Sequence, residues 1–138
     1  MLFRGTDAWT CSYLVKRLKA EPDKFYMVYP DPELVNVCFW YIPERLRAVP
    51  HGPERMQELG KVRINSMNDC VAFCVMLSIA QITAQLKGRM MSAGTLMISY
   101  QPLGDIPNFF RNIVSNPGAQ HKDMDFLISE LDRLGHDL

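Results

Sequence analysis

Arg111 is the residue whose surroundings most clearly suggest chemistry. It lies in the stretch Asn108-Phe-Phe-Arg-Asn-Ile-Val-Ser-Asn-Pro117, whose aromatic and β-branched residues favour a strand. Side chains alternate along a strand, so Phe109, Arg111 and Ile113 share one face. A guanidinium between two apolar neighbours is costly to bury alone, and its planar fork of donors matches a carboxylate. The residues alone leave two interpretations open: Arg111 reaches water at a sheet edge, the commoner case, or it binds an anion.

Other catalytic or metal-binding patterns are not found in the sequence. Four cysteines show no CxxC spacing, and three histidines lie far from them, so a zinc site is not expected. These residues are Cys11, Cys38, Cys70, Cys74, His51, His121 and His136. No glycine-rich phosphate loop, paired-carboxylate motif or nucleophile elbow is present. Reduced thiols in a cytoplasmic protein are the simplest account of the cysteines.

Length and composition indicate one ordinary domain. The chain has 138 residues, 48% of them apolar, and a formal net charge of zero, so nothing suggests binding to nucleic acid or to an acidic membrane surface. The N-terminus lacks the apolar core of a secretion signal. Residues 70–86 carry no charge, but this run is shorter than the roughly 20 apolar residues of a membrane span and contains polar side chains. We therefore expect no transmembrane segment.

Periodicity predicts a small α+β domain, with helices packed on a small, mostly antiparallel sheet. Strand patterns favour residues 25–29, 35–42, 95–100 and the stretch around Arg111, with a turn at 101–105. Asp7 is a candidate N-cap for a first helix whose apolar face includes Trp9, Tyr13, Leu14 and Leu18, and Gly94 is a candidate C-cap. Further helices are expected at 54–61, at 86–92 and from Asp123 to Gly135, the last with a clear apolar stripe. The second half of the strand at 35–42 is expected to be covered on both faces.

Four blocks of sequence carry a resemblance to a known family. They are Val35-Asn-Val-Cys-Phe-Trp-Tyr-Ile-Pro43, Tyr100-Gln-Pro-Leu-Gly-Asp105, Asn108-Phe-Phe-Arg111, and Asp125-Phe-Leu-Ile128 with Leu131-Asp-Arg-Leu-Gly-His-Asp-Leu138. In this order they resemble the C-terminal end of glutamate decarboxylase. The wider family is the pyridoxal-phosphate-dependent acidic amino-acid decarboxylases, which include cysteine sulfinate decarboxylase. The resemblance implies that residues 1–138 are the small C-terminal domain of a fold-type I enzyme, without its large cofactor-binding domain.

The resemblance also implies a role for Arg111. In this family the arginine of the Phe-Phe-Arg motif grips a substrate carboxylate, which favours the anion-binding interpretation. The implied reaction is loss of the α-carboxylate from glutamate or a similar acidic amino acid, with pyridoxal 5'-phosphate as cofactor and a homodimer as the assembly. Cysteine sulfinate and aspartate remain alternative substrates.

The cofactor lysine of this family is not expected in this chain. The family places it in an Asn-Pro-His-Lys motif of the large domain. Here Asn116-Pro117 and His121-Lys122 are separated by three residues, so Lys122 is not expected to form a Schiff base. We therefore expect the chain to be inactive alone. A stand-alone module that docks on full-length decarboxylase subunits is the alternative.

Residues 63–83 interrupt the resemblance. Removing Arg63–Thr83 joins Lys61-Val62 to Ala84-Gln-Leu-Lys87, which approximately restores the family pattern of one helix. We therefore interpret this segment as a probable insertion. It is expected to pack poorly, or to lengthen a helix without joining the core.

Overall fold

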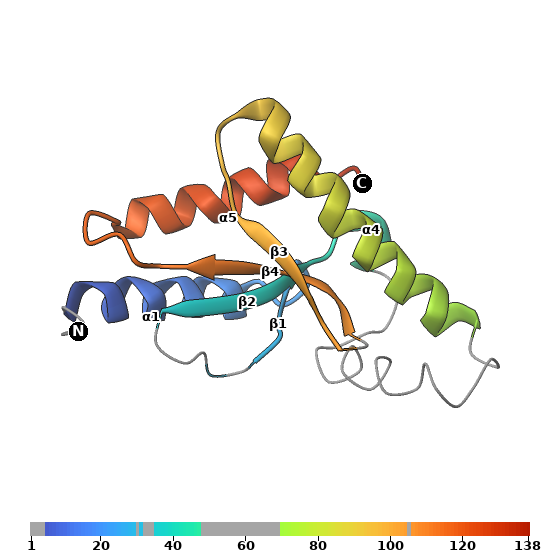
Figure 1. Ribbon diagram of the computed structural model, residues 1–138, viewed down its shortest axis with the longest axis horizontal. Coiled ribbons are helices and arrows are strands. Elements are labelled where there is room, and N and C mark those ends of the chain that lie inside the picture. Colours follow the sequence, from blue (N-terminus) through green and yellow to red (C-terminus); the bar gives the residue numbers. More distant parts are fainter. Residues whose placement is uncertain (1–4, 30, 32–34, 48–69, 105) are drawn as a thin grey trace.

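A four-stranded sheet forms the centre of the part of the chain that the structure describes (Figure 1). The computed structural model describes residues 5–29, 31, 35–47, 70–104 and 106–138. The helix expected at 54–61, the loop histidine His51 and residues 63–69 of the suspected insertion lie outside the described residues. In the described part, every pair of neighbouring strands is antiparallel, which confirms the predicted α+β class.

The strand order in the sheet is β1-β2-β4-β3. The strands are β1 (Phe25–Met27), β2 (Asn36–Tyr41), β3 (Ser99–Leu103) and β4 (Ile106–Ile113). The register pairs Trp40 of β2 with Tyr26 of β1, and Cys38 of β2 with Arg111 of β4. The Arg111 strand therefore lies inside the sheet, and β3 is the edge strand beside it.

The position of β3 differs from the sequence prediction. The expected strand was 95–100 followed by a turn, whereas β3 begins at Ser99 and continues through Gln101 and Pro102 to Leu103. A proline has no N–H for the ladder, but an edge strand has one unpaired side and can accommodate it. The pairing is irregular between Gln101 and Leu103. The chain then reverses at Gly104, whose φ of 55° suits a residue without a side chain.

The described helices are α1 (Gly5–Ala20), α2 (Glu44–Arg47), α4 (Cys70–Ala93) and α5 (His121–Gly135). The sequence predicted Asp7 as the N-cap of the first helix. That prediction was wrong, because α1 begins two residues earlier, at Gly5. α4 is much longer than the predicted 86–92 because the uncharged run before it is also helical. Gly94 ends α4 as predicted: its φ is 68°, and its N–H donates to Met90 O at 2.9 Å. None of the described helices is long and apolar enough to cross a membrane.

Two apolar clusters hold these elements together. Helices α1 and α5 lie side by side on one face of the sheet, and the larger cluster fills the space between them and that face (Figure 1). The predicted stripe of α5 is confirmed by the burial of Met124, Leu127, Ile128, Leu131 and Leu134. Trp9 differs from its prediction: it is 66% exposed, while Leu14 and Leu18 of α1 are buried.

The smaller cluster covers the other face of β2, as the sequence predicted. It contains Trp40, whose Nε1–H donates to Pro107 O at 3.2 Å, together with Cys38 and Phe109. Helix α4 joins both clusters, since Ile82 packs in the smaller and Leu86 in the larger. A buried strand between two apolar layers is stabilised on both faces.

Residues 70–83 of the suspected insertion lengthen a helix, α4, as one of the two alternatives expected, but the end of the segment joins the core, which was not expected. Ile82 and Thr83 are each 1% exposed. The Thr83 hydroxyl donates to Asn108 O at 3.1 Å, which ties α4 to the strand that carries Arg111. Whether residues 63–83 are an insertion stays a prediction.

A pair of glycine substitutions tests the packing of α5 on β2. An added Cβ at Gly135 would lie 2.6 Å from Tyr41 Cε1, so Gly135→Ala is expected to lower the free energy of unfolding by about 1–3 kcal/mol. At Gly88, within α4, a Cβ meets no atom within 4 Å, and Gly88→Ala is expected to add about 0.5–1 kcal/mol. Urea unfolding of both variants measures the difference. Equal effects of the two substitutions would contradict the packing described here.

Candidate functional site

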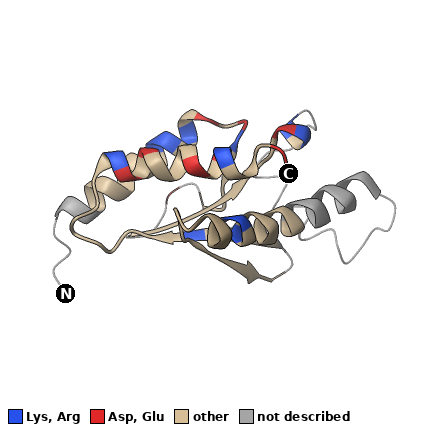
Figure 2. Ribbon diagram, turned by 90° about the horizontal axis from the view of Figure 1, so that it is seen from above, with Lys and Arg blue, Asp and Glu red and all other residues tan. Residues whose placement is uncertain are grey.

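Arg111 occupies an interior position of the sheet. Its register partners are Cys38 on β2 and Ser99 on β3, and its face is the one on which Phe109 packs in the smaller cluster. It is the only charged residue in the four described strands. The other charges of the described part lie on helices and loops, and α5 alone carries six of them (Figure 2). The sheet-edge interpretation therefore does not apply, because the edge strand is β3.

A cavity of about 400 Å³ opens beside Arg111. Its lining combines polar groups from β3 and β4 with apolar side chains. The lining residues are Met97, Ile98, Ser99, Gln101, Arg111, Asn112 and Ile113. This volume is sufficient for a small organic acid.

The positive charge of the Arg111 guanidinium is not neutralised by an acidic side chain of the described residues. Its Nη1 donates to the amide oxygen of Gln101 at 3.0 Å, and its Nε is buried with no hydrogen-bond partner in the described part of the chain. None of the ion pairs found among the described residues involves Arg111. A guanidinium held by a neutral amide retains its full attraction for an external anion.

Cys38 is a neutral neighbour of this site. Burial raises the pKa of its thiol, and the nearby charge of Arg111 offsets only part of that increase. Its Sγ lies 3.6 Å from Asn36 Oδ1. Because the thiol is protonated at neutral pH, it does not compete as an anion for Arg111.

The described lysines do not have the surroundings expected of a lysine that forms a Schiff base with pyridoxal phosphate, the cofactor implied by the resemblance. Lys24 pairs with Glu21 and Asp132, and Lys87 donates to Ile98 O at 2.6 Å. Lys122 is exposed in the first turn of α5 and lacks the desolvated setting of a Schiff-base lysine. The two others, Lys16 and Lys19, are exposed on α1. None of the described lysines therefore has the desolvated setting that a Schiff-base lysine needs.

His121, the neighbour of Lys122, packs its ring against two aromatic side chains of α1. Its ring stacks on Tyr13 with a centroid distance of 3.8 Å and approaches Trp9 at 4.0 Å. These contacts join the start of α5 to α1, and Trp9 and His121 also line a separate cavity of about 490 Å³. No group of histidine, cysteine, aspartate and glutamate side chains within the described ranges could hold a metal ion.

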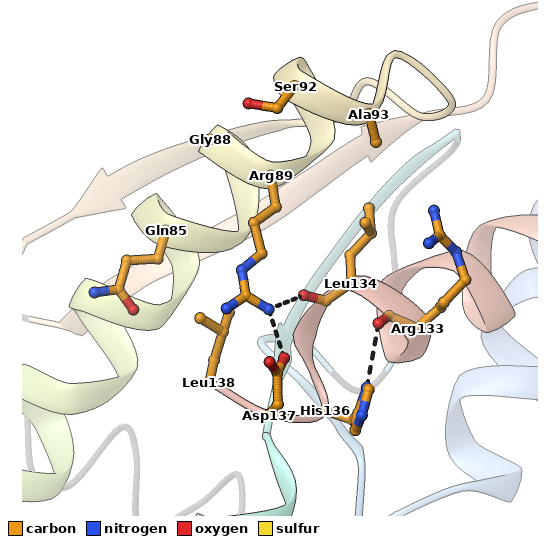
Figure 3. A pocket seen from close by; sticks show the side chains of 10 residues that line it. All are labelled: Gln85, Gly88, Arg89, Ser92, Ala93, Arg133, Leu134, His136, Asp137 and Leu138. Atoms are coloured by element: carbon orange, nitrogen blue, oxygen red, sulfur yellow. Dashed lines mark hydrogen bonds and ion pairs between the residues drawn. The ribbon is translucent and has the colours of Figure 1, made fainter.

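A third cavity, of about 840 Å³, lies where α4 and α5 end (Figure 3). Its cations already have partners. Arg89 Nη1 donates to Leu134 O at 2.7 Å and to Asp137 Oδ1 at 2.5 Å, and Arg133 pairs with Glu130. Arg89 binds a carbonyl in the last turn of α5 and stabilises that end of the helix, while Arg133 is paired within α5, so both arginines serve the fold.

Sequence reasoning found Arg111 but missed Gln101 and Arg89. Gln101 was assigned to a turn, and only the extension of β3 to Leu103 places it beside Arg111. Arg89 shows no local pattern, since its partners lie 45 and 48 residues further along the chain.

Comparison with known proteins identifies relatives of the chain. No protein-family profile matches it. It is 42% identical over 126 residues to glutamate decarboxylase of Drosophila melanogaster, a match that covers 91% of this chain and 21% of that protein. The crystal structure of mouse CSAD, cysteine sulfinate decarboxylase, matches with a TM-score of 0.72 and 38% identity, over 96% of this chain and 23% of that one. Its apo form gives the same values.

A more distant structure shows the same fold. The crystal structure of Rhodiola rosea 4-hydroxyphenylacetaldehyde synthase matches with a TM-score of 0.62 at 16% identity, over 96% of this chain and 22% of that one. The chain thus spans about a fifth of the length of the relatives it matches. The resemblance to glutamate decarboxylase that the four sequence blocks indicated is confirmed. In sequence and in fold, this chain is a homologue of one segment of glutamate decarboxylase and of cysteine sulfinate decarboxylase, about a fifth of each.

Proposed function

We propose that the chain is the C-terminal, substrate-carboxylate-binding part of a pyridoxal-phosphate-dependent decarboxylase that acts on glutamate or a similar acidic amino acid. One observation carries the proposal: Arg111 is the only charged residue of the described strands and lines a cavity with no carboxylate bound to it from the described residues. A structural arginine at such a position would normally be paired with an acid. The relatives that share 38% or more of their residues with the chain, glutamate decarboxylase of Drosophila melanogaster and mouse CSAD, are decarboxylases, which supports the proposal.

The role proposed for Arg111 is to bind and orient the substrate. A guanidinium fork that holds a carboxylate limits the rotation of the amino acid and presents it in one orientation to the rest of the enzyme. The site on this chain then supplies affinity and orientation, and the bond-breaking groups belong to the remainder of a full-length enzyme. A homodimer, which the family resemblance implies, stays a prediction.

The chain alone is expected to bind no cofactor covalently. With pyridoxal phosphate added, borohydride reduction should leave no lysine of the purified chain stoichiometrically modified, because the described lysines are ion-paired, bonded to carbonyl oxygen or exposed. Absorbance and peptide mass spectrometry measure the modification. A stoichiometric pyridoxyl group on one specific lysine would contradict the proposal that the cofactor site lies elsewhere.

The alternative function is a non-catalytic module that docks on full-length decarboxylase subunits. It is favoured by exposed apolar side chains around the Arg111 cavity, since Met97 is 62% and Ile113 is 47% exposed. Two titrations of the purified chain, one with L-glutamate and one with full-length decarboxylase subunits, distinguish the two functions. Saturable binding at Arg111 supports the first, whereas binding to decarboxylase subunits without glutamate binding supports the second.

A further inference from the structure

We propose that Gln101 is the positioning residue for Arg111 and that its amide N–H group adds a donor to the carboxylate site. This inference rests on the proposed function, because it concerns the same cavity. Gln101 would hold the guanidinium in one orientation without neutralising it. The ligand class is a small carboxylic acid that binds to the terminal nitrogens of the guanidinium.

The placement of Gln101 supports this role. It is the only half-buried residue of β3, whose other four residues are exposed. Its register partner is Phe109, two residues before Arg111, so Gln101 and Arg111 are diagonal neighbours on adjacent strands. Diagonal side chains on one face are within reach of each other when they are long. The pairing becomes irregular immediately after Gln101, so the register that brings the two residues together ends there.

The donors of Arg111 determine how an acid can approach. Nε is buried without a hydrogen-bond partner among the described residues, so a ligand in the cavity cannot reach it without displacing its neighbours. Nη1 already donates one hydrogen to Gln101 Oε1 at 3.0 Å. The second hydrogen of Nη1 and both hydrogens of Nη2 remain for a ligand. A carboxylate therefore binds end-on, through the two terminal nitrogens.

The amide of Gln101 has a defined orientation. Its oxygen must face the guanidinium, because Arg111 offers only donors. Its NH₂ group is then left to donate elsewhere, and no hydrogen bond from it is found within the described residues. Both Gln101 and Arg111 line the same cavity, so this amide nitrogen can donate to the carboxylate that Arg111 holds.

Gln101 suits this role because its side chain is uncharged as well as long enough to contact Arg111. A glutamate at this position would form an ion pair with Arg111 and would occupy the fork that the ligand needs. A glutamine fixes the guanidinium and leaves its charge for the ligand. The chemistry of this residue therefore distinguishes a binding arginine from a structural one.

Two measurements on the 138-residue chain test the role of Gln101. The first is the rotation rate of the Arg111 guanidinium about its Nε–Cζ bond, measured by ¹⁵N NMR without ligand. Gln101→Met keeps the length and apolar stem but removes the amide, so this rotation is expected to become several-fold faster. The matched control is Gln85→Met, an exposed position on α4 that lines another cavity, which should leave the rotation unchanged.

The second measurement is NMR titration with L-glutamate as the probe. Gln101→Met is expected to weaken binding about fivefold, the effect of losing about one hydrogen bond. Gln101→Glu is expected to abolish it, and Gln101→Asn to restore part of it. Wild-type rotation and affinity in Gln101→Met would overturn the inference even if Arg111→Met abolishes binding. Absence of glutamate binding by the wild-type chain would instead refute the proposed function, while the rotation rate would still decide whether Gln101 positions Arg111.

Discussion

Arg111→Met is expected to weaken L-glutamate binding by the folded chain about 10- to 100-fold. Methionine fills a similar volume along the strand but has no N–H donor and no charge. The loss corresponds to the charge-assisted hydrogen bonds between a guanidinium and a carboxylate, which are about twice as strong as neutral ones. NMR titration with L-glutamate, followed at the backbone amides of Ser99 and Asn112 beside the cavity, measures the dissociation constant.

Lys16→Met is the matched control for this variant. Lys16 is exposed on α1 and takes part in none of the ion pairs found in the described ranges, so its loss changes the net charge equally without touching the cavity. This control should bind glutamate as the wild type does. If both variants lost affinity equally, the effect would be one of overall charge, and Arg111 would have no specific role. If neither did, the carboxylate would bind elsewhere.

Asp132→Ala is expected to lower the free energy of unfolding at neutral pH by about 2–3 kcal/mol. The carboxylate of Asp132 on α5 accepts hydrogen bonds from Tyr41 Oη at 2.7 Å, Lys24 Nζ at 3.1 Å and Arg47 Nη2 at 3.1 Å. Its removal leaves the partly buried Arg47 without its acid and leaves Lys24 with Glu21 as its remaining partner. The cost stays below that of a fully buried network because the side chain of Asp132 is 31% exposed. Urea unfolding followed by fluorescence measures it.

The same substitution should change the response of stability to acid. Partial burial by itself would raise the pKa of Asp132, but the hydrogen bonds from Tyr41 and Lys24 outweigh it and hold that pKa below its ordinary value. The stabilisation is therefore complete above the unfolded pKa of about 3.9, and it is lost as the pH falls through the lower folded pKa. Asp132→Ala should unfold with a weaker dependence on pH in that range.

Asp31→Ala provides the control for Asp132. Asp31 is 97% exposed and pairs with Lys19 at 3.8 Å, so its removal is expected to change the free energy of unfolding by less than about 0.5 kcal/mol. A similar loss of stability in both variants would show that the effect reflects net charge rather than the Asp132 network.

The local sequence pattern was sufficient to predict the helices and strands whose apolar residues recur with a clear period. Apolar residues on both faces of β2 predicted that its second half is covered on both sides, and the stripe from Met124 to Leu134 predicted α5 and its buried face. The residue at which α4 begins and the extent of β3 were not predicted. An uncharged run without clear periodicity does not show where a helix begins, and Pro102 and Gly104 favour a turn until an adjacent strand is known to accept them.

The candidate site was predictable only in part. The sequence identified Arg111 and the face it shares with Phe109, and the family resemblance proposed a ligand for it. Its contact with Gln101 depends on the register between β3 and β4, which no local pattern specifies. The same holds for the Asp132 network, because Tyr41 and Lys24 lie 91 and 108 residues away from it in the sequence. Long-range contacts of this kind are settled by packing.

The central claim is that Arg111 holds the carboxylate of an acidic amino acid. The most direct test is to observe the Arg111 side-chain resonances during addition of L-glutamate to the wild-type chain. We predict a saturable shift of its guanidinium signals together with those of Gln101, and no saturable shift at Arg89 or Arg133 in the cavity where α4 and α5 end. Unchanged Arg111 signals at saturating glutamate, or a response confined to Arg89 and Arg133, would contradict the claim.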